Sequence, residues 1–234
     1  MYFHGTAAQL KAITVGTNNT YFKKAAKHTN VHDYTKAVTK ATLSKDGKIV
    51  YTCALCGAKK TTALRKVSKI SLSKTKLVYS GKAQKPALYV RNSAGNAINS
   101  KYYTVSWSNA SSKAIGRYTV TVTLKGIYSG KKTLTYSIVP KQVTGVKKTA
   151  ATAKSIKLSW AKVTGGKYYQ VYAKNAAGAW KLVKTVSVNY VTVTKIDGKA
   201  LAPGKTYYFK VRALNAAKTC IGAFSPVYKA ATAK

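Results

Sequence analysis

Residues 201–213, with the sequence LAPGKTYYFKVRA, constrain the fold more than any other part of the chain. The dipeptide Pro203-Gly204 is typical of a turn, and the residues after it alternate between two sets. A period of two is that of a β-strand with one face in a core and one face in water. The inner set is Tyr207, Phe209, Val211 and Ala213, and the outer set is Tyr208, Lys210 and Arg212.

The order of Leu201, the Pro-Gly turn and Tyr207 also matches the tyrosine corner of β-sandwiches. In that feature the tyrosine hydroxyl bonds to backbone a few residues upstream. We expect Tyr207 to fill this role, with Leu201 packed below it. Trp160 ends the alternating run SIKLSW and is expected to be the core tryptophan. Residues 141–234 are therefore predicted to form a seven-stranded sandwich.

The upstream chain is interpreted by the same rules. Residues 70–140 carry short alternating runs separated by turn residues, which favours a second sandwich. In residues 41–69 a CxxCG knuckle lies between two expected strands, which indicates a small β-hairpin module. Residues 1–40 are basic and weakly patterned, and we expect an irregular lead-in with room for one short strand or helix. Nothing in the sequence suggests a long helix, so the predicted fold class is all-β.

The charge of the chain is its most unusual property. It holds 42 Lys and Arg against 3 Asp and Glu, which gives a net charge of +39 at pH 7. The three acids are Asp33, Asp46 and Asp197, and the basic excess is spread over all the segments. A protein that reads nucleic-acid sequence usually concentrates its basic residues on one face. An even coat of lysine indicates instead a property of the whole surface.

These motifs also carry a resemblance to known families. Residues 143–232 resemble a fibronectin type III domain of bacterial surface proteins, through SIKLSW, YYQVYAK and LAPGKTYYFKVRA. Residues 70–140 resemble a bacterial immunoglobulin-like repeat, through LVYSGKAQKPALYV and IGRYTVTVTLKGIYSG. The stretch KATLSKDGKIVYTCALCGAKKT resembles the small CxxC module that precedes such repeats in large secreted proteins of clostridia and related gut bacteria. The resemblance implies tandem β-sandwiches, immunoglobulin-like and then fibronectin type III, after the CxxC module.

The sequence departs from these families in its charge. Positions where such domains commonly carry acids are here Lys167, Gln170, Ala179 and Lys218. Selection for positive charge would produce this pattern, and so would deliberate resurfacing of a natural scaffold, which replaces exposed acids and leaves the core intact.

The candidate metal site combines His28, His32, Cys53 and Cys56. A CxxC pair presents two thiolates to one ion, and an HxxxH pair could complete a tetrahedral Zn²⁺ site. The alternatives are a Cys53–Cys56 disulfide, free thiols, or only three real ligands. Four protein ligands leave no position for water, so this single zinc ion would be structural.

Catalytic chemistry has few residues available. The three acids fall in different segments, so paired carboxylates for acid–base catalysis are not expected. All three histidines lie in residues 1–40, and the sequence contains no GxGxxG, P-loop or HExxH motif. Cys220 is best interpreted as a small buried hydrophobic residue or as an exposed residue without a functional role. The sequence therefore indicates a protein that is not an enzyme.

Basic residues interleaved with aromatic ones favour binding of polyanions. Outward-facing tyrosines such as Tyr168 and Tyr208 could stack on bases or sugars. Lysine far outnumbers arginine, and it is a hydrated point charge where arginine is a bidentate fork, so non-specific attraction is favoured over base reading. The candidate contact residues are Lys147, Lys148, Lys167, Tyr208, Lys210 and Arg212.

The sequence thus predicts a cationic binding protein of the cell surface or the secreted space. Its expected partners are nucleic acid, anionic glycans, teichoic acids or anionic lipid surfaces. Alternatives are a structural stalk or adhesin module, or an engineered supercharged scaffold for nucleic-acid delivery. No apolar run approaches the roughly 20 residues of a membrane-spanning helix. The first residues lack the pattern of a signal peptide, so we expect that peptide to be absent from this chain, and we expect a monomer.

Overall fold

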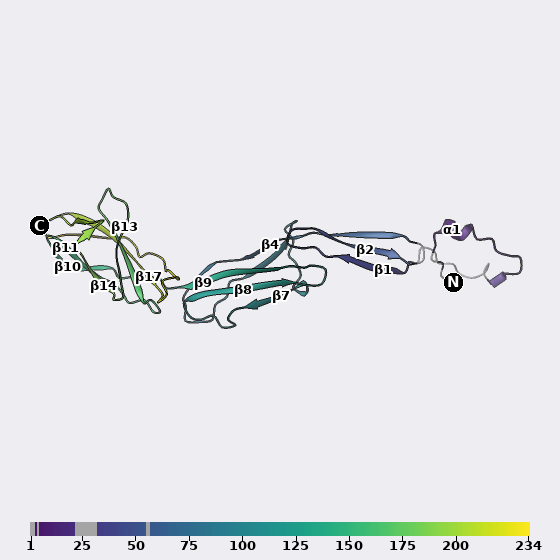
Figure 1. Cartoon of the computed structure of the whole chain (residues 1–234), viewed down its shortest axis with the longest axis horizontal. Coiled ribbons are helices and arrows are strands. Elements are labelled where there is room, and N and C mark those ends of the chain that lie inside the picture. The colour runs from purple at the N-terminus through teal and green to yellow at the C-terminus, as the bar shows by residue number, and fades with distance from the viewer. Residues whose placement is uncertain (1–2, 4, 22–31, 55–56) are drawn as a thin grey trace. The chain divides into compact units, whose positions relative to one another are not determined.

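The computed structural model describes residues 3, 5–21, 32–54 and 57–234 (Figure 1). The predicted all-β class with β-sandwich domains is confirmed. The chain divides into two compact units, the first made of Met1–Ser71, Tyr89–Val105 and Val122–Lys132, and the second of Leu72–Leu88, Ser106–Thr121 and Thr133–Lys234. Strands of the middle segment contribute to both units.

The first unit begins with a short helix and a small sheet. Helix α1 (Ala7–Lys11) starts at Thr6, whose hydroxyl accepts from the Gln9 backbone N–H at 3.1 Å in a capping box. The antiparallel sheet has the order β1-β2-β3, with β1 at Tyr34–Thr39, β2 at Gly47–Cys53 and β3 at Lys59–Leu64. Strand β1 lies within the stretch expected to be irregular, so this sheet starts upstream of residue 41. Every residue of β1 is exposed, which explains why the sequence shows no apolar alternation there.

The middle segment supplies two further sheets. Strands β4 (Val67–Leu72) and β6 (Leu88–Asn92) form one sheet. The other has the order β5-β9-β8-β7, with β5 at Lys76–Val78, β7 at Tyr103–Trp107 after the 3-10 turn η1 (Ser100–Tyr102), β8 at Gly116–Leu124 and β9 at Lys131–Val139. The expected alternation in β8 is present, because Val120, Val122 and Leu124 are buried while the threonines between them are not.

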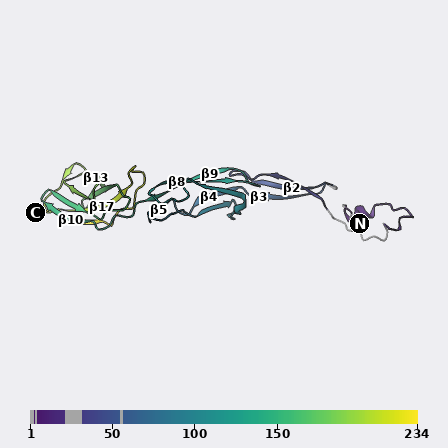
Figure 2. The same ribbon diagram turned by 90° about the horizontal axis from the view of Figure 1, so that it is seen from below.

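The second unit contains a seven-stranded sandwich within residues 141–234, all of which the structure describes. One sheet has the order β10-β11-β14, with β10 at Lys147–Thr152, β11 at Ser155–Ser159 and β14 at Tyr190–Val193. The other has the order β13-β12-β17-β18, with β12 at Tyr168–Lys174, β13 at Lys181–Val186, β17 at Thr206–Leu214 and β18 at Tyr228–Ala231. Figures 1 and 2 show these strands together in the green-to-yellow part of the chain.

The core of this sandwich contains the residues that the sequence predicted. Trp160, Leu201 and Tyr207 are buried in one cluster with the inner residues of β12 and β17. The rings of Trp160 and Tyr169 meet edge to face, with 5.4 Å between centroids. Burial of apolar surface at about 25 cal/mol per Å² is the main stabilising contribution to such a core. Because the inner residues of β17 lie in this cluster, the outer residues of the same strand point away from it.

A short hairpin is added to the seven strands. Strands β15 (Lys195–Ile196) and β16 (Lys199–Ala200) pair through a turn at Asp197-Gly198, where both residues have positive φ, 51° and 78°. Aspartate followed by glycine is a favoured sequence for such a two-residue hairpin turn. This hairpin lies between β14 and β17 in sequence and forms one wall of the cavity described below.

Candidate binding face of the C-terminal sandwich

The outer face of β12 and β17 gathers cationic and aromatic side chains. Because Phe209 and Val211 are fully buried, their neighbours on β17 must face outward. The antiparallel register places Lys210 opposite Tyr172 and Arg212 opposite Gln170. Side chains directly opposite each other on one face are close enough to interact. At these two positions the face therefore has a cation on β17 and a polar or aromatic partner on β12.

Arg212 is held by two hydrogen bonds and two rings. Its Nε donates to Gln170 Oε1 at 2.8 Å, and its Nη2 donates to the Tyr172 hydroxyl at 3.2 Å. The guanidinium carbon lies 4.6 Å from the ring centroid of Phe224 and 5.3 Å from that of Tyr172. This planar cation is thus fixed in position while part of it stays open to solvent.

Lys210 lies between two aromatic rings. Its Nζ is 4.3 Å from the Trp180 ring centroid and 4.3 Å from the Phe224 ring centroid. Each such cation–π contact is worth about 0.5–1 kcal/mol at an exposed site, so this arrangement stabilises the fold as well as presenting charge. Desolvation lowers the pKa of Lys210, and the neighbouring charges of Arg212 and Lys174 lower it further.

Lys174 extends the same arrangement along the sheet. Its Nζ lies 5.7 Å from the Trp180 ring centroid and 5.8 Å from that of Tyr208. We call the whole set the cationic–aromatic strip. Its members are Tyr172, Lys174, Trp180, Tyr208, Lys210, Arg212 and Phe224.

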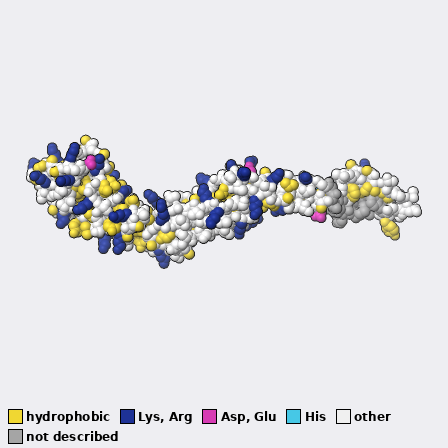
Figure 3. All heavy atoms as spheres, in the orientation of Figure 1, with side chains coloured by type: hydrophobic (Ala, Val, Ile, Leu, Met, Phe, Trp, Pro, Cys, Tyr) yellow, Lys and Arg dark blue, Asp and Glu magenta, His cyan; other side chains and the backbone are white. Residues whose placement is uncertain are grey.

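The structure gathers three of the six predicted contact residues. Tyr208, Lys210 and Arg212 are on the strip, side by side on one face of β17. Lys147 and Lys148 are exposed on β10, in the other sheet, and Lys167 is exposed just before β12. The predicted six do not form one site. The exposed lysines are scattered over the visible face in Figure 3, as the even charge of the sequence predicted.

Four members of the strip were not predicted from sequence. Tyr172 and Lys174 alternate with buried residues on β12, and this period-two pattern could have identified them. Trp180 and Phe224 lie outside the strands, because β13 begins at Lys181 and β18 begins at Tyr228. No local pattern links these two rings to Lys210.

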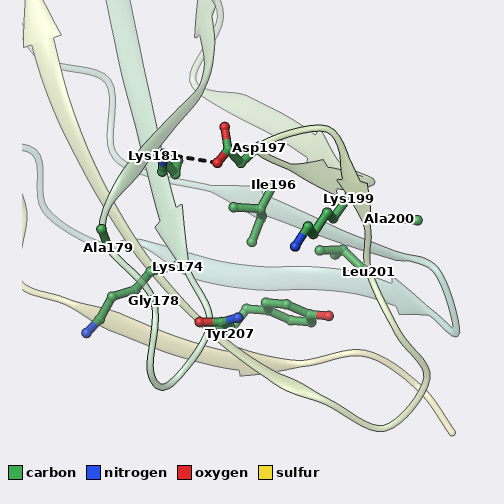
Figure 4. A pocket seen from close by; sticks show the side chains of 11 residues that line it. Lys174, Gly178, Ala179, Lys181, Ile196, Asp197, Lys199, Ala200, Leu201 and Tyr207 are labelled. Carbon is green, nitrogen blue, oxygen red and sulfur yellow. Dashed lines mark ion pairs between the residues drawn. The ribbon is translucent and has the colours of Figure 1, made fainter.

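A cavity of about 280 Å³ lies beside the strip (Figure 4). Tyr207 forms one wall and the β15–β16 hairpin forms another, with Ile196 pointing between them. At its rim Lys181 Nζ and Asp197 Oδ2 form an ion pair at 3.0 Å, with both side chains well exposed. Lys174 lines the cavity with its stem while its ammonium points away from it, so the cavity and the strip share this residue.

The predicted metal site is only partly described. His28 and Cys56 lie outside the described residues. Cys53 is buried at the end of β2, and the ring of His32 lies 5.2 Å from that of Tyr34. Among residues 3, 5–21, 32–54 and 57–234 no three His, Cys, Asp or Glu side chains are close enough to hold an ion. Since half of the proposed ligands fall outside these residues, the structural zinc ion stays a prediction.

One comparison with known proteins gives a family match within the C-terminal sandwich. Residues 140–220 match a family described as GH85 endohexosaminidases, C-terminal domain. Several solved structures are similar to about two fifths of the chain. FN3tt is 24% identical and covers 41% of this chain and 96% of its own, with a TM-score of 0.34. The sixth fibronectin type III domain of human fibronectin type III domain containing protein 3 is 21% identical, covering 42% of this chain and 89% of its own, with a TM-score of 0.34.

A further similar structure is the fn3 domain of the human collagen alpha-1(XX) chain, 19% identical over 41% of this chain and 85% of its own, with a TM-score of 0.33. The comparison with curated proteins gives no match. Over the part of the chain that the structure describes, no helix is long and apolar enough to cross a membrane.

Proposed function

We propose that this chain is a non-catalytic binding module that associates with polyanions through electrostatic attraction. The observation that carries the proposal is the cationic–aromatic strip, where Lys210 and Arg212 are fixed over aromatic rings on an outer face. Fixed cations bind an anionic chain with less loss of conformational entropy than free side chains do. The partly exposed rings beside them give flat surfaces on which bases or sugar rings can stack.

The charge of the whole chain supports the same proposal. A net charge of +39 raises the local concentration of any polyanion and speeds association. Binding to nucleic acid is then driven by release of condensed counterions, which does not depend on sequence. Nucleic acid, anionic glycans, teichoic acids and anionic lipid surfaces all offer this charge. Because the family matched by residues 140–220 is the C-terminal domain of endohexosaminidases, glycans deserve a test beside nucleic acid.

The proposal extends to location and assembly. A bacterial secreted or cell-surface protein would meet such polymers in the envelope, and we propose that the chain acts there as a monomer carrying at most one structural zinc ion. The two alternative functions, a structural stalk and an engineered scaffold, differ in the polyanion binding that they predict. A passive stalk would bind no polyanion, whereas an engineered cationic scaffold would bind through its whole surface with no preference for the strip.

Matched double variants distinguish the proposed function from these alternatives. Lys210→Gln with Arg212→Gln removes two positive charges from the strip, and Lys147→Gln with Lys148→Gln removes two from β10. Isothermal titration with heparin at low salt should show a loss of about tenfold for the first pair and at most about twofold for the second. Equal losses of heparin affinity in the two double variants would show that binding depends only on the total charge of the chain. Absence of binding by the unaltered chain would refute the proposed function itself.

A further inference from the structure

The cavity beside the strip is lined by aromatic, apolar, acidic and cationic side chains together, and not by lysines alone. Its walls combine the Tyr207 ring, the apolar Ile196 and the ammonium of Lys199, which points inward above the ring in Figure 4. At about 280 Å³ it lies just below the range for ligand pockets, about 300–1,000 Å³. Such a space fits one ring of a small ligand.

Asp197 is the decisive residue of this cavity. It is the single acid of residues 141–234, a segment otherwise rich in lysine, and it lies on the cavity wall. Its carboxylate binds Lys181 at 3.0 Å, which ties the β15–β16 hairpin to β13. At 63% side-chain exposure it can still accept further hydrogen bonds.

A carboxylate selects among anionic ligands by their hydroxyl groups. A phosphodiester backbone brings negative charge and, in DNA, no free hydroxyl along the chain, so Asp197 repels it. A sugar ring brings several hydroxyl donors that a carboxylate accepts strongly. Its C–H faces pack on apolar surface, which Ile196 and the accessible part of the largely buried Tyr207 ring provide. Lys199 would then pair with an acidic substituent of the sugar.

We infer that this cavity binds one carboxylated sugar residue of an acidic glycan. The hydroxyls of the sugar donate hydrogen bonds to the Asp197 carboxylate, and the carboxylate of the sugar pairs with the Lys199 ammonium. This inference rests on the proposed function, since it names the class of polyanion. The adjoining strip would contact the glycan beyond that residue, because Lys174 belongs to both the cavity lining and the strip.

The test uses the full chain and three variants with two probes. The probes are a short oligogalacturonate and a short DNA duplex, each titrated at one low ionic strength. Asp197→Asn removes the charge and keeps a residue that tolerates positive φ, so the hairpin turn is retained. Lys199→Gln removes the inward ammonium. Lys195→Gln is its matched control, because Lys195 is exposed on the same hairpin and does not line the cavity.

The sign of the Asp197→Asn effect decides the matter. We expect oligogalacturonate binding to weaken about tenfold in Asp197→Asn and in Lys199→Gln, and to change less than about twofold in Lys195→Gln. DNA binding should instead strengthen slightly in Asp197→Asn. If Asp197→Asn strengthens binding of both probes, or if Lys199→Gln and Lys195→Gln weaken it equally, the cavity proposal is overturned while general polyanion binding stands. If the unaltered chain binds neither probe, the proposed function fails as well.

Discussion

The hydroxyl of Tyr207 accepts a hydrogen bond from the backbone N–H of Ala202 at 2.9 Å. This contact closes the turn that leads into β17, and Leu201 is buried on its inner side at 3% exposure. The contact is the tyrosine corner that the order Leu, Pro-Gly, Tyr predicted. It fixes the start of the strand that carries Tyr208, Lys210 and Arg212, so the strip depends on it for its position.

Removal of this one hydrogen bond should destabilise the C-terminal sandwich. Tyr207→Phe keeps the buried ring and leaves the Ala202 N–H without its partner, so we expect a loss of about 1 kcal/mol. Tyr208→Phe changes a hydroxyl on the outer face and should cost almost nothing. Native-state hydrogen exchange of the slowest β12 and β17 amides measures the stability of this sandwich within the full chain. Equal losses, or a larger loss for Tyr208→Phe, would mean that the faces of β17 are reversed.

Period-two alternation allowed most of the C-terminal sandwich to be predicted. In β11, β12 and β17 every second residue is buried, so the sequence carries the core directly. Strand β10 lacks this signal. Its sequence KKTAAT is almost wholly exposed and shows no alternation, because its position depends on pairing with β11.

The candidate site was harder to predict than the core. Lys210 could be placed on the outer face of β17, but the rings that enclose it come from Trp180 and Phe224. These rings lie 30 residues before it and 14 residues after it in a chain whose loops carry no period. The cavity also needs the β15–β16 hairpin to fold back toward Tyr207, which no local pattern specifies.

The pKa of Lys210 should respond to its neighbours. Desolvation is the largest cause of its lowered pKa, and the charge of Arg212 adds to it, so Arg212→Gln should move the pKa upward toward the ordinary value for lysine. Between the lowered folded pKa and the ordinary unfolded pKa, the unfolded chain binds more protons, so this group makes stability rise as pH rises through that window. NMR titration of the lysine side chains measures the midpoint directly, and an unchanged midpoint in Arg212→Gln would contradict the contribution of this charge.

The zinc prediction concerns the first part of the chain. Protein prepared without chelator should contain about one equivalent of zinc, and Cys53→Ser with Cys56→Ser should remove it. Cys220→Ser is the control, since Cys220 is buried in the C-terminal sandwich and should leave the metal content unchanged. Elemental analysis gives the content, and mass spectrometry gives the thiol state. A Cys53–Cys56 disulfide in protein that contains no zinc would refute the predicted metal site.

The salt dependence of binding tests the account most directly. Dissociation constants should be measured for the full chain with two unrelated DNA duplexes of equal length across a series of salt concentrations. Because lysine-dominated charge acts through counterion release, the logarithm of the association constant, which is the reciprocal of the dissociation constant, should fall linearly with log[salt], by about 0.9 for each phosphate neutralised. We predict a steep slope that is the same for both duplexes. A shallow slope, or strong preference for one duplex, would contradict electrostatic polyanion binding as the activity of this protein.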